Sequence, residues 1–120
     1  MPNWQISFRP ECEDECRELP EAIQDELYAR LGKLAEFGPD LGRPDVDTLQ
    51  GSSFPNMKEL RFQLNGVWRF AFAFDPKRRA IVLVGGDKQG ERSARFYGWL
   101  IKTADSRFAA HIAEMKKKIG

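Results

Sequence analysis

The chain has 120 residues, of which 42% are apolar, 12% aromatic and 31% charged, a composition typical of one soluble globular domain over residues 1–120. The net charge of +1 conceals an asymmetry. Residues 1–56 carry 5 basic and 12 acidic residues, whereas residues 57–102 carry 10 basic and 4 acidic ones, so we expect the second block to face a polyanion.

Membrane, secretory and metal-binding classes are all disfavoured. No apolar run approaches the roughly 20 residues that span a bilayer, and the first residues lack the basic and apolar regions of a signal peptide. We therefore expect a cytoplasmic protein. Cys12, Cys16 and a single distant His111 are too few for a structural zinc site, so the sequence predicts reduced thiols, no metal and no cofactor.

The first third of the chain predicts a strand followed by two helices. Apolar and polar residues alternate over 3–9, as in a strand with one buried face. Pro10 and the acidic residues after it suit the first turn of a short helix, which Pro20 ends or interrupts. Apolar residues at helical spacing then predict a second helix over 20–37, stopped by Gly38 and Pro39.

The rest predicts a connection, a three-stranded meander and a long helix. Residues 38–56 are rich in Gly, Pro, Asp and Ser and are expected to form a surface connection, with Leu49 as its anchor. Strands are predicted over 57–64, 67–74 and 79–86, joined by short turns. From about Ser93 onward apolar residues recur every three or four positions, which predicts an amphipathic helix. The expected order is β-α-α-β-β-β-α.

The register of the first two meander strands decides where their charges lie. A two-residue turn would pair Phe62 with Arg69 and mix aromatic and charged side chains on both faces. A three-residue loop with Gly66 in the left-handed region sorts them. One face then holds Leu60, Phe62, Leu64, Trp68, Phe70, Phe72 and Phe74, and the other holds Glu59, Arg61, Gln63 and Arg69 with Ala71 and Ala73. Because exposed aromatic surface costs about 25 cal/mol per Å², we expect the second register.

This register predicts a charged site. Arg61 and Arg69 become cross-strand neighbours, which repel unless an anion or Glu59 lies between them, and the small Ala71 and Ala73 leave room for a ligand. The alternative is that Glu59 forms a structural ion pair with one arginine. Lys88 follows the last strand within a glycine-rich segment beside the arginines. The whole cationic set is Lys58, Arg61, Arg69, Lys88, Arg92 and Arg95.

The usual catalytic groups are missing from the sequence around this set. His111 stands alone on the last helix, and no serine or cysteine has a histidine to activate it. A cationic set binds phosphates, and it also stabilises a pentavalent phosphorane when RNA supplies its own 2′-OH as nucleophile. The three C-terminal lysines fit either RNA contact or the negative end of the helix dipole.

The element order and several motifs resemble the RelE/ParE toxin superfamily, in particular its HigB-like, phage-related branch. The motifs are Met57-Lys58-Glu59-Leu60-Arg61-Phe62, Val67-Trp68-Arg69-Phe70, Phe72-Ala73-Phe74-Asp75-Pro76, Gly86-Asp87-Lys88 and the segment from Arg95-Phe96-Tyr97 to His111. The resemblance covers nearly the whole chain. It implies an α+β, RelE-like microbial RNase fold, with a mainly antiparallel sheet packed on a helical hairpin and a long C-terminal helix.

The resemblance also implies a function. The chain is expected to be the toxin of a type II toxin-antitoxin pair, a ribosome-dependent mRNA endoribonuclease neutralised by a helix-turn-helix antitoxin. Arg61, Arg69 and Lys88 match the catalytic basic residues of the family. Lys58, Arg92, Arg95 and Tyr97 are expected to contact RNA, although Tyr97 also fits the apolar stripe of the last helix and core packing is the favoured explanation for it. The general base is open between Glu59, Lys88 and a group of the ribosome or the substrate.

Two other functions use the same sequence features. A ParE-like toxin poisons DNA gyrase without cutting RNA, because a shared fold does not fix function. A noncatalytic domain that binds RNA or a protein needs the basic block but no reaction centre.

Overall fold

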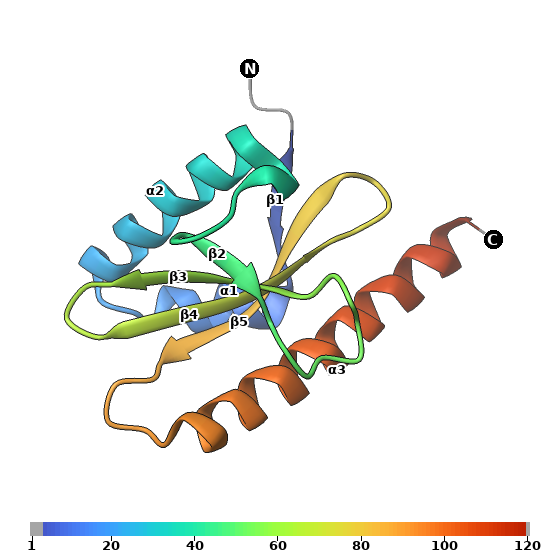
Figure 1. The fold of residues 1–120 in the computed structure, drawn as a ribbon. Coiled ribbons are helices and arrows are strands. Elements are labelled where there is room, and N and C mark those ends of the chain that lie inside the picture. The colour runs from blue at the N-terminus through green and yellow to red at the C-terminus, as the bar shows by residue number, and fades with distance from the viewer. Residues whose placement is uncertain (1–3, 120) are drawn as a thin grey trace.

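A computed structural model describes residues 4–119 and places a central sheet between helices (Figure 1). In chain order the elements are β1 (Gln5–Phe8), α1 (Pro10–Arg17), α2 (Glu21–Phe37), the 3-10 turn η1 (Gly38–Asp40), β2 (Val46–Thr48), β3 (Lys58–Gln63), β4 (Val67–Phe74), β5 (Arg79–Asp87) and α3 (Ser93–Ile119). None of the helices within these residues is long and apolar enough to cross a membrane. The helices and the mainly antiparallel sheet confirm the predicted α+β class.

The sheet has the strand order β1-β5-β4-β3-β2 in the described chain. Strand β1 pairs with β5 in parallel, and the other neighbours are antiparallel. The predicted meander and both predicted helices before it are present. The strand predicted over 3–9 begins at Gln5, and residue 3 lies outside the described residues.

The prediction of a plain surface connection over 38–56 is wrong in part. This segment contains η1 and the short strand β2, whose Val46 pairs with Leu60 of β3. Three residues are too few to show an alternating pattern, and β2 exists because the edge of β3 offers backbone groups to pair with. Leu49 is buried, as the anchoring role requires.

Each face of the sheet has its own apolar core. On one face the aromatic side chains of β3 and β4 meet the buried residues of α1 and α2, including Cys12 and Cys16, which are free thiols. On the other face α3 covers the sheet through Phe96, Leu100 and Phe108. Figure 1 shows α2 and α3 on opposite sides of the strands. Because side chains alternate along β4, this strand contributes residues to both cores.

The expected register between β3 and β4 is confirmed. Arg61 lies opposite Arg69 and Gln63 lies opposite Val67, so three residues form the loop. Gly66, with φ 152°, has the positive φ expected of it, and Asn65, with φ 47°, also lies in the left-handed region. Asparagine tolerates that region better than other residues with a side chain.

The expected space beside the two alanines does not exist. Ala71 and Ala73 are completely buried and belong to the core under α3. Their small side chains let the helix approach the sheet closely. Any ligand of the charged face must therefore bind beyond the area that α3 covers.

Candidate functional site

Two arginines lie side by side at the centre of the charged face, but they differ in exposure. Arg61 on β3 and Arg69 on β4 are directly opposed across the strand pair. The Arg69 side chain is 8% exposed, whereas that of Arg61 is 30% exposed. Arg69 is thus a fixed part of the structure, and Arg61 is the one of the pair that reaches solvent.

Arg69 is held by a buried polar cluster. Its Nε donates to Tyr97 Oη at 3.2 Å, and its Nη1 donates to the carbonyl of Trp68 at 2.9 Å. Tyr97 Oη in turn donates to Glu59 Oε1 at 2.8 Å, and that carboxylate oxygen lies 3.8 Å from Arg69 Nε. Burial, followed by the hydrogen bond to Glu59, raises the pKa of Tyr97 above its ordinary value. Tyr97 therefore stays a neutral phenol that joins the two charges.

Arg61 has a looser carboxylate partner. Its Nη1 lies 3.6 Å from Asp47 Oδ2 on β2, and the same oxygen accepts two hydrogen bonds from Arg43 at 2.7 and 2.9 Å. A separate carboxylate for each arginine reduces the repulsion between the pair. The Arg61 guanidinium keeps donors free for a further anion, since one contact at 3.6 Å exceeds hydrogen-bond length.

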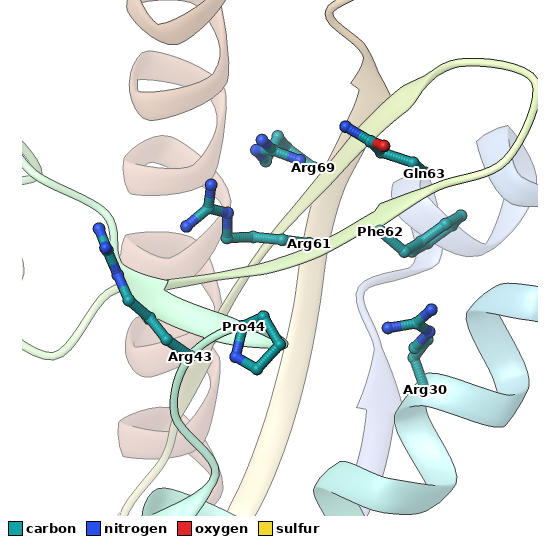
Figure 2. Close-up of a pocket in the computed structure, with 7 residues that line it drawn as sticks. All are labelled: Arg30, Arg43, Pro44, Arg61, Phe62, Gln63 and Arg69. Carbon is teal, nitrogen blue, oxygen red and sulfur yellow. The ribbon is translucent and has the colours of Figure 1, made fainter.

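A cavity of about 450 Å³ opens beside this pair (Figure 2). The residues that line it are Arg30, Arg43, Pro44, Arg61, Phe62, Gln63 and Arg69. In Figure 2, Arg61, Arg69 and Gln63 lie on one side of β3, while Arg30 and Phe62 lie on the other. Of the four arginines that line the opening, Arg30, Arg43 and Arg69 are hydrogen-bonded to protein acceptors, which leaves Arg61 with the most donors for an oxyanion.

The short strand β2 determines where the cavity opens. Strand β2 pairs with Lys58 to Leu60 of β3. One further backbone hydrogen bond follows, in which Arg61 N donates to the carbonyl of Asp45 at 2.8 Å. Phe62 and Gln63 are therefore left on an uncovered strand edge. An uncovered edge gives a ligand access to both faces of the sheet.

Arg30 reaches the cavity from α2 and was not predicted from the sequence. Its guanidinium lies 5.8 Å from the centre of the Phe62 ring, with Nε on Glu26 at 2.7 Å and Nη1 on Asp45 at 3.0 Å. In the sequence, Glu26 and Arg30 are simply an i,i+4 pair typical of a solvated helix face. Arg43, in the connection before β2, carries no sequence signal either.

The remaining basic residues of the predicted site are not all in the cavity. Strand alternation places Lys58 on the same face as Leu60 and Phe62, opposite to Arg61. Lys88 follows β5 and donates its backbone N–H to Val67 at 2.8 Å, which places it on the face of Arg69. The structure thus brings Lys88, and not Lys58, to the side of the arginine pair.

Arg92 and Arg95 lie at the start of α3 and are exposed. Arg95 lines a different cavity of about 410 Å³, together with Gly86, Asp87 and Trp99 among others. Neither residue lines the arginine cavity. In the sequence they lie between Lys88 and Tyr97. A ligand longer than the arginine cavity could therefore contact these two cationic side chains outside the cavity.

Comparisons with known proteins show the family to which the chain belongs. The family described as "Phage derived protein Gp49-like (DUF891)" matches residues 14–109. The chain belongs to this family. A Mycobacterium tuberculosis protein named "Putative toxin HigB2" is 47% identical over 92 residues, and one named "Putative toxin HigB3" is 53% identical over 70 residues. These matches confirm the expected likeness to the HigB branch.

The matches to these two curated proteins are partial on both sides. They cover 75% of this chain and 45% of the first protein, and 58% of this chain and 60% of the second. The Gp49-like chain thus spans about half the length of the curated relatives it matches.

Solved structures confirm the fold. A free mutant of the Escherichia coli toxin RelE has a TM-score of 0.60 at 16% identity and covers 82% of this chain and 95% of its own. RelE in its intact complex with the antitoxin RelB has a TM-score of 0.54 at 16% identity, covering 74% and 99%. Likeness at such low identity establishes the RelE-like fold of this Gp49-like protein.

Proposed function

We propose that this chain is the toxin of a type II toxin-antitoxin pair and that it cuts mRNA on translating ribosomes. The observation that carries the proposal is the opposed pair Arg61 and Arg69 beside an open cavity. Its support is the family membership and the naming of two relatives as HigB toxins. A gyrase poison does not require opposed arginines at a cavity, whereas a simple RNA binder is separated from an enzyme by the cleavage experiment below.

The reaction uses a nucleophile that the RNA itself provides. The 2′-oxygen attacks the adjacent phosphorus, the bond from phosphorus to the 5′-oxygen breaks, and a 2′,3′-cyclic phosphate and a 5′-hydroxyl result. Arg61 contacts the phosphate oxygens on which negative charge accumulates, and Arg69 supports it from its fixed position. Preorganised donors of this kind are worth about 10²- to 10³-fold each in rate.

The proton of the 2′-hydroxyl must pass to a base. Glu59 was the first candidate in the sequence, but its carboxylate is buried and accepts from Tyr97. This favours a positioning role for Glu59, which holds Arg69 and Tyr97 in place. Lys88, half-buried on the same face, is then the better-placed proton carrier.

Its partners follow from the proposal. RelE is known in complex with its antitoxin, and we propose a helix-turn-helix antitoxin for this chain, with mRNA on the ribosome as its target. The site of action is then the cytoplasm, where translating ribosomes are found.

The first experiment is to induce expression of the chain and map the 5′ ends of cellular mRNA. We expect translation to stop within minutes and new 5′ ends to appear inside coding regions. The matched control is Arg61→Ala, which removes one guanidinium and leaves the buried cluster intact. Intact mRNA together with DNA damage would identify a gyrase poison instead, and would contradict the proposal.

A further inference from the structure

A second, smaller cavity lies at the opposite end of α3 from Tyr97. It has a volume of about 190 Å³ and lies between the β1–β5 edge and the C-terminal half of the helix. Its basic lining residues are Arg9, Lys77, Arg79, His111 and Lys118. Tyr97 and His111 are 14 residues apart, so about 21 Å of helix separate this cavity from the arginine pair. The reaction proposed above uses none of these residues.

Arg9 is a buried cation with spare donors at this cavity. Its side chain is 9% exposed, and its Nη1 donates to Glu114 Oε1 at 3.1 Å. Its Nε is buried and has no hydrogen-bond partner among residues 4–119, with the nearest carboxylate, Glu11, at 3.4 Å. Glu11 therefore balances the charge at Nε without a well-formed hydrogen bond, and an oxyanion in the cavity would supply the acceptor that this buried donor lacks.

The carboxylates near the cavity do not neutralise all of its cations. Asp75 is completely buried and is occupied by Arg79 at 2.7 Å and by His111 Nε2 at 2.9 Å. Glu114 is occupied by Arg9. Lys77 and Lys118 have no carboxylate within 4.0 Å in the part of the chain that the structure describes. Two exposed ammonium groups therefore flank a buried guanidinium, an arrangement that suits a phosphate group.

We infer that this cavity is a phosphate-binding site that anchors the RNA backbone away from the reaction centre. The inference rests on the proposed function for the source of the phosphate, but the chemistry of the site is independent of it. The two cavities lie at opposite edges of the sheet, and α3 runs from Tyr97, which contacts Arg69, to His111 at the second cavity, so a single-stranded RNA must extend along the molecule to contact both. Phosphate contacts of this kind position a nucleic acid without reading its sequence.

The test uses paired charge reversals at equal net charge. Lys77→Glu with Lys118→Glu changes two lysines of the cavity. Lys116→Glu with Lys117→Glu changes two exposed lysines of the same last helical turn that do not line it. Amide shifts of the folded chain are recorded during titration with inorganic phosphate, and affinity for a single-stranded RNA is measured across salt concentrations.

We expect phosphate to shift the amides around Arg9, Lys77 and His111, and the cavity variant to abolish those shifts. RNA affinity should fall at least 10-fold in the cavity variant, with a salt slope smaller by about 2, and less than 3-fold in the control. Equal losses in both variants would mean diffuse attraction and would overturn the inference. Binding of an acidic peptide at this cavity in preference to RNA and phosphate would also overturn it.

The two proposals fail separately. If the wild-type chain cuts mRNA and the cavity variant cuts it with unchanged apparent affinity, the anchor is wrong and the function stands. If phosphate and RNA bind at the cavity but no RNA is cut, the anchor stands and the nuclease is wrong.

Discussion

Arg61 and Arg69 show how two like charges coexist at neighbouring positions. Each guanidinium has its own carboxylate, Glu59 for Arg69 and Asp47 for Arg61, and Tyr97 bridges the buried pair. Arg69 is buried and held by hydrogen bonds, whereas Arg61 is 30% exposed and contacts Asp47 only at 3.6 Å. We expect this difference to separate a positioning residue from one that contacts the substrate.

Tyr97→Phe removes one hydroxyl group and tests whether this hydroxyl links Glu59 to Arg69. The change removes the hydrogen bond to Glu59 and the acceptor for Arg69 Nε while keeping the ring in the core. We expect the free energy of unfolding to fall by about 1 kcal/mol, as for the loss of a partly buried hydrogen bond. Chemical denaturation measures this, and an unchanged unfolding midpoint would contradict the bridging role.

Individual residues of the site differ in how far the sequence predicts them. The pairing of Arg61 with Arg69 follows from the alternation of aromatic residues along the two strands, because only one register buries the aromatic side chains on a single face. The burial of Arg69 depends on where α3 crosses the sheet, and no local pattern encodes that. Arg30 and Arg43 enter the cavity through tertiary packing alone.

Gly85 of β5 lies directly opposite Phe70 of β4, whose ring covers the glycine. A Cβ built there would lie 2.0 to 2.6 Å from atoms of the Phe70 ring. Phe70 is almost completely buried and packs in the aromatic core with Phe62 and Trp68. The glycine therefore lets one large ring cover the strand, which keeps β4 and its Arg69 in position.

Gly85→Ala should be strongly destabilising, by at least about 1–3 kcal/mol, because the ring has no room to retreat. Gly32→Ala on α2 is the matched control, since its Cβ would meet nothing within 4 Å. There the same substitution should stabilise by up to about 1 kcal/mol through helix propensity. Thermal unfolding of both variants measures the contrast, and equal melting temperatures would refute this packing.

Among the helices and strands, the sequence predicts the long elements with a repeating hydrophobic pattern but not the shortest strand. The long periodic segments all appear as expected, since each pattern extends over several turns or residue pairs. Strand β2 was missed because its three residues pair only once β3 is in place. The cavity position was missed for the same reason, because β2 decides which part of the β3 edge stays open.

On the scale of the whole molecule, Asp45 ties the connection before β2 to α2 and to the sheet. Its carboxylate accepts from Arg30 at 3.0 Å and from Lys33 at 2.8 Å, and its carbonyl accepts from Arg61 N. The hydrogen bond from Lys33, which outweighs the opposing effect of burial, lowers the pKa of Asp45, and Arg30 lowers it further. One residue thus links three parts of the fold around the cavity.

This link predicts an acid-dependent loss of stability. A carboxyl group with a lowered pKa stabilises the folded state above its unfolded pKa, near the ordinary value of 3.8, and that contribution disappears as the pH falls through the lowered value. Asp45→Asn should therefore cost about 1–3 kcal/mol at pH 7 and much less at pH 3. Urea unfolding at both pH values tests this, and a constant difference would contradict the assignment.

The most direct measurement of the central claim is the cleavage rate of mRNA on translating ribosomes at saturating enzyme, compared between wild type and Arg61→Ala. Arg17→Ala is the control, an exposed arginine of α1 paired with Glu13 and Asp14. We predict that Arg61→Ala lowers the rate constant by 100-fold or more while affinity falls less than 10-fold, and that Arg17→Ala changes neither. An unchanged rate constant with lost affinity would show that Arg61 only binds RNA and would contradict the claim.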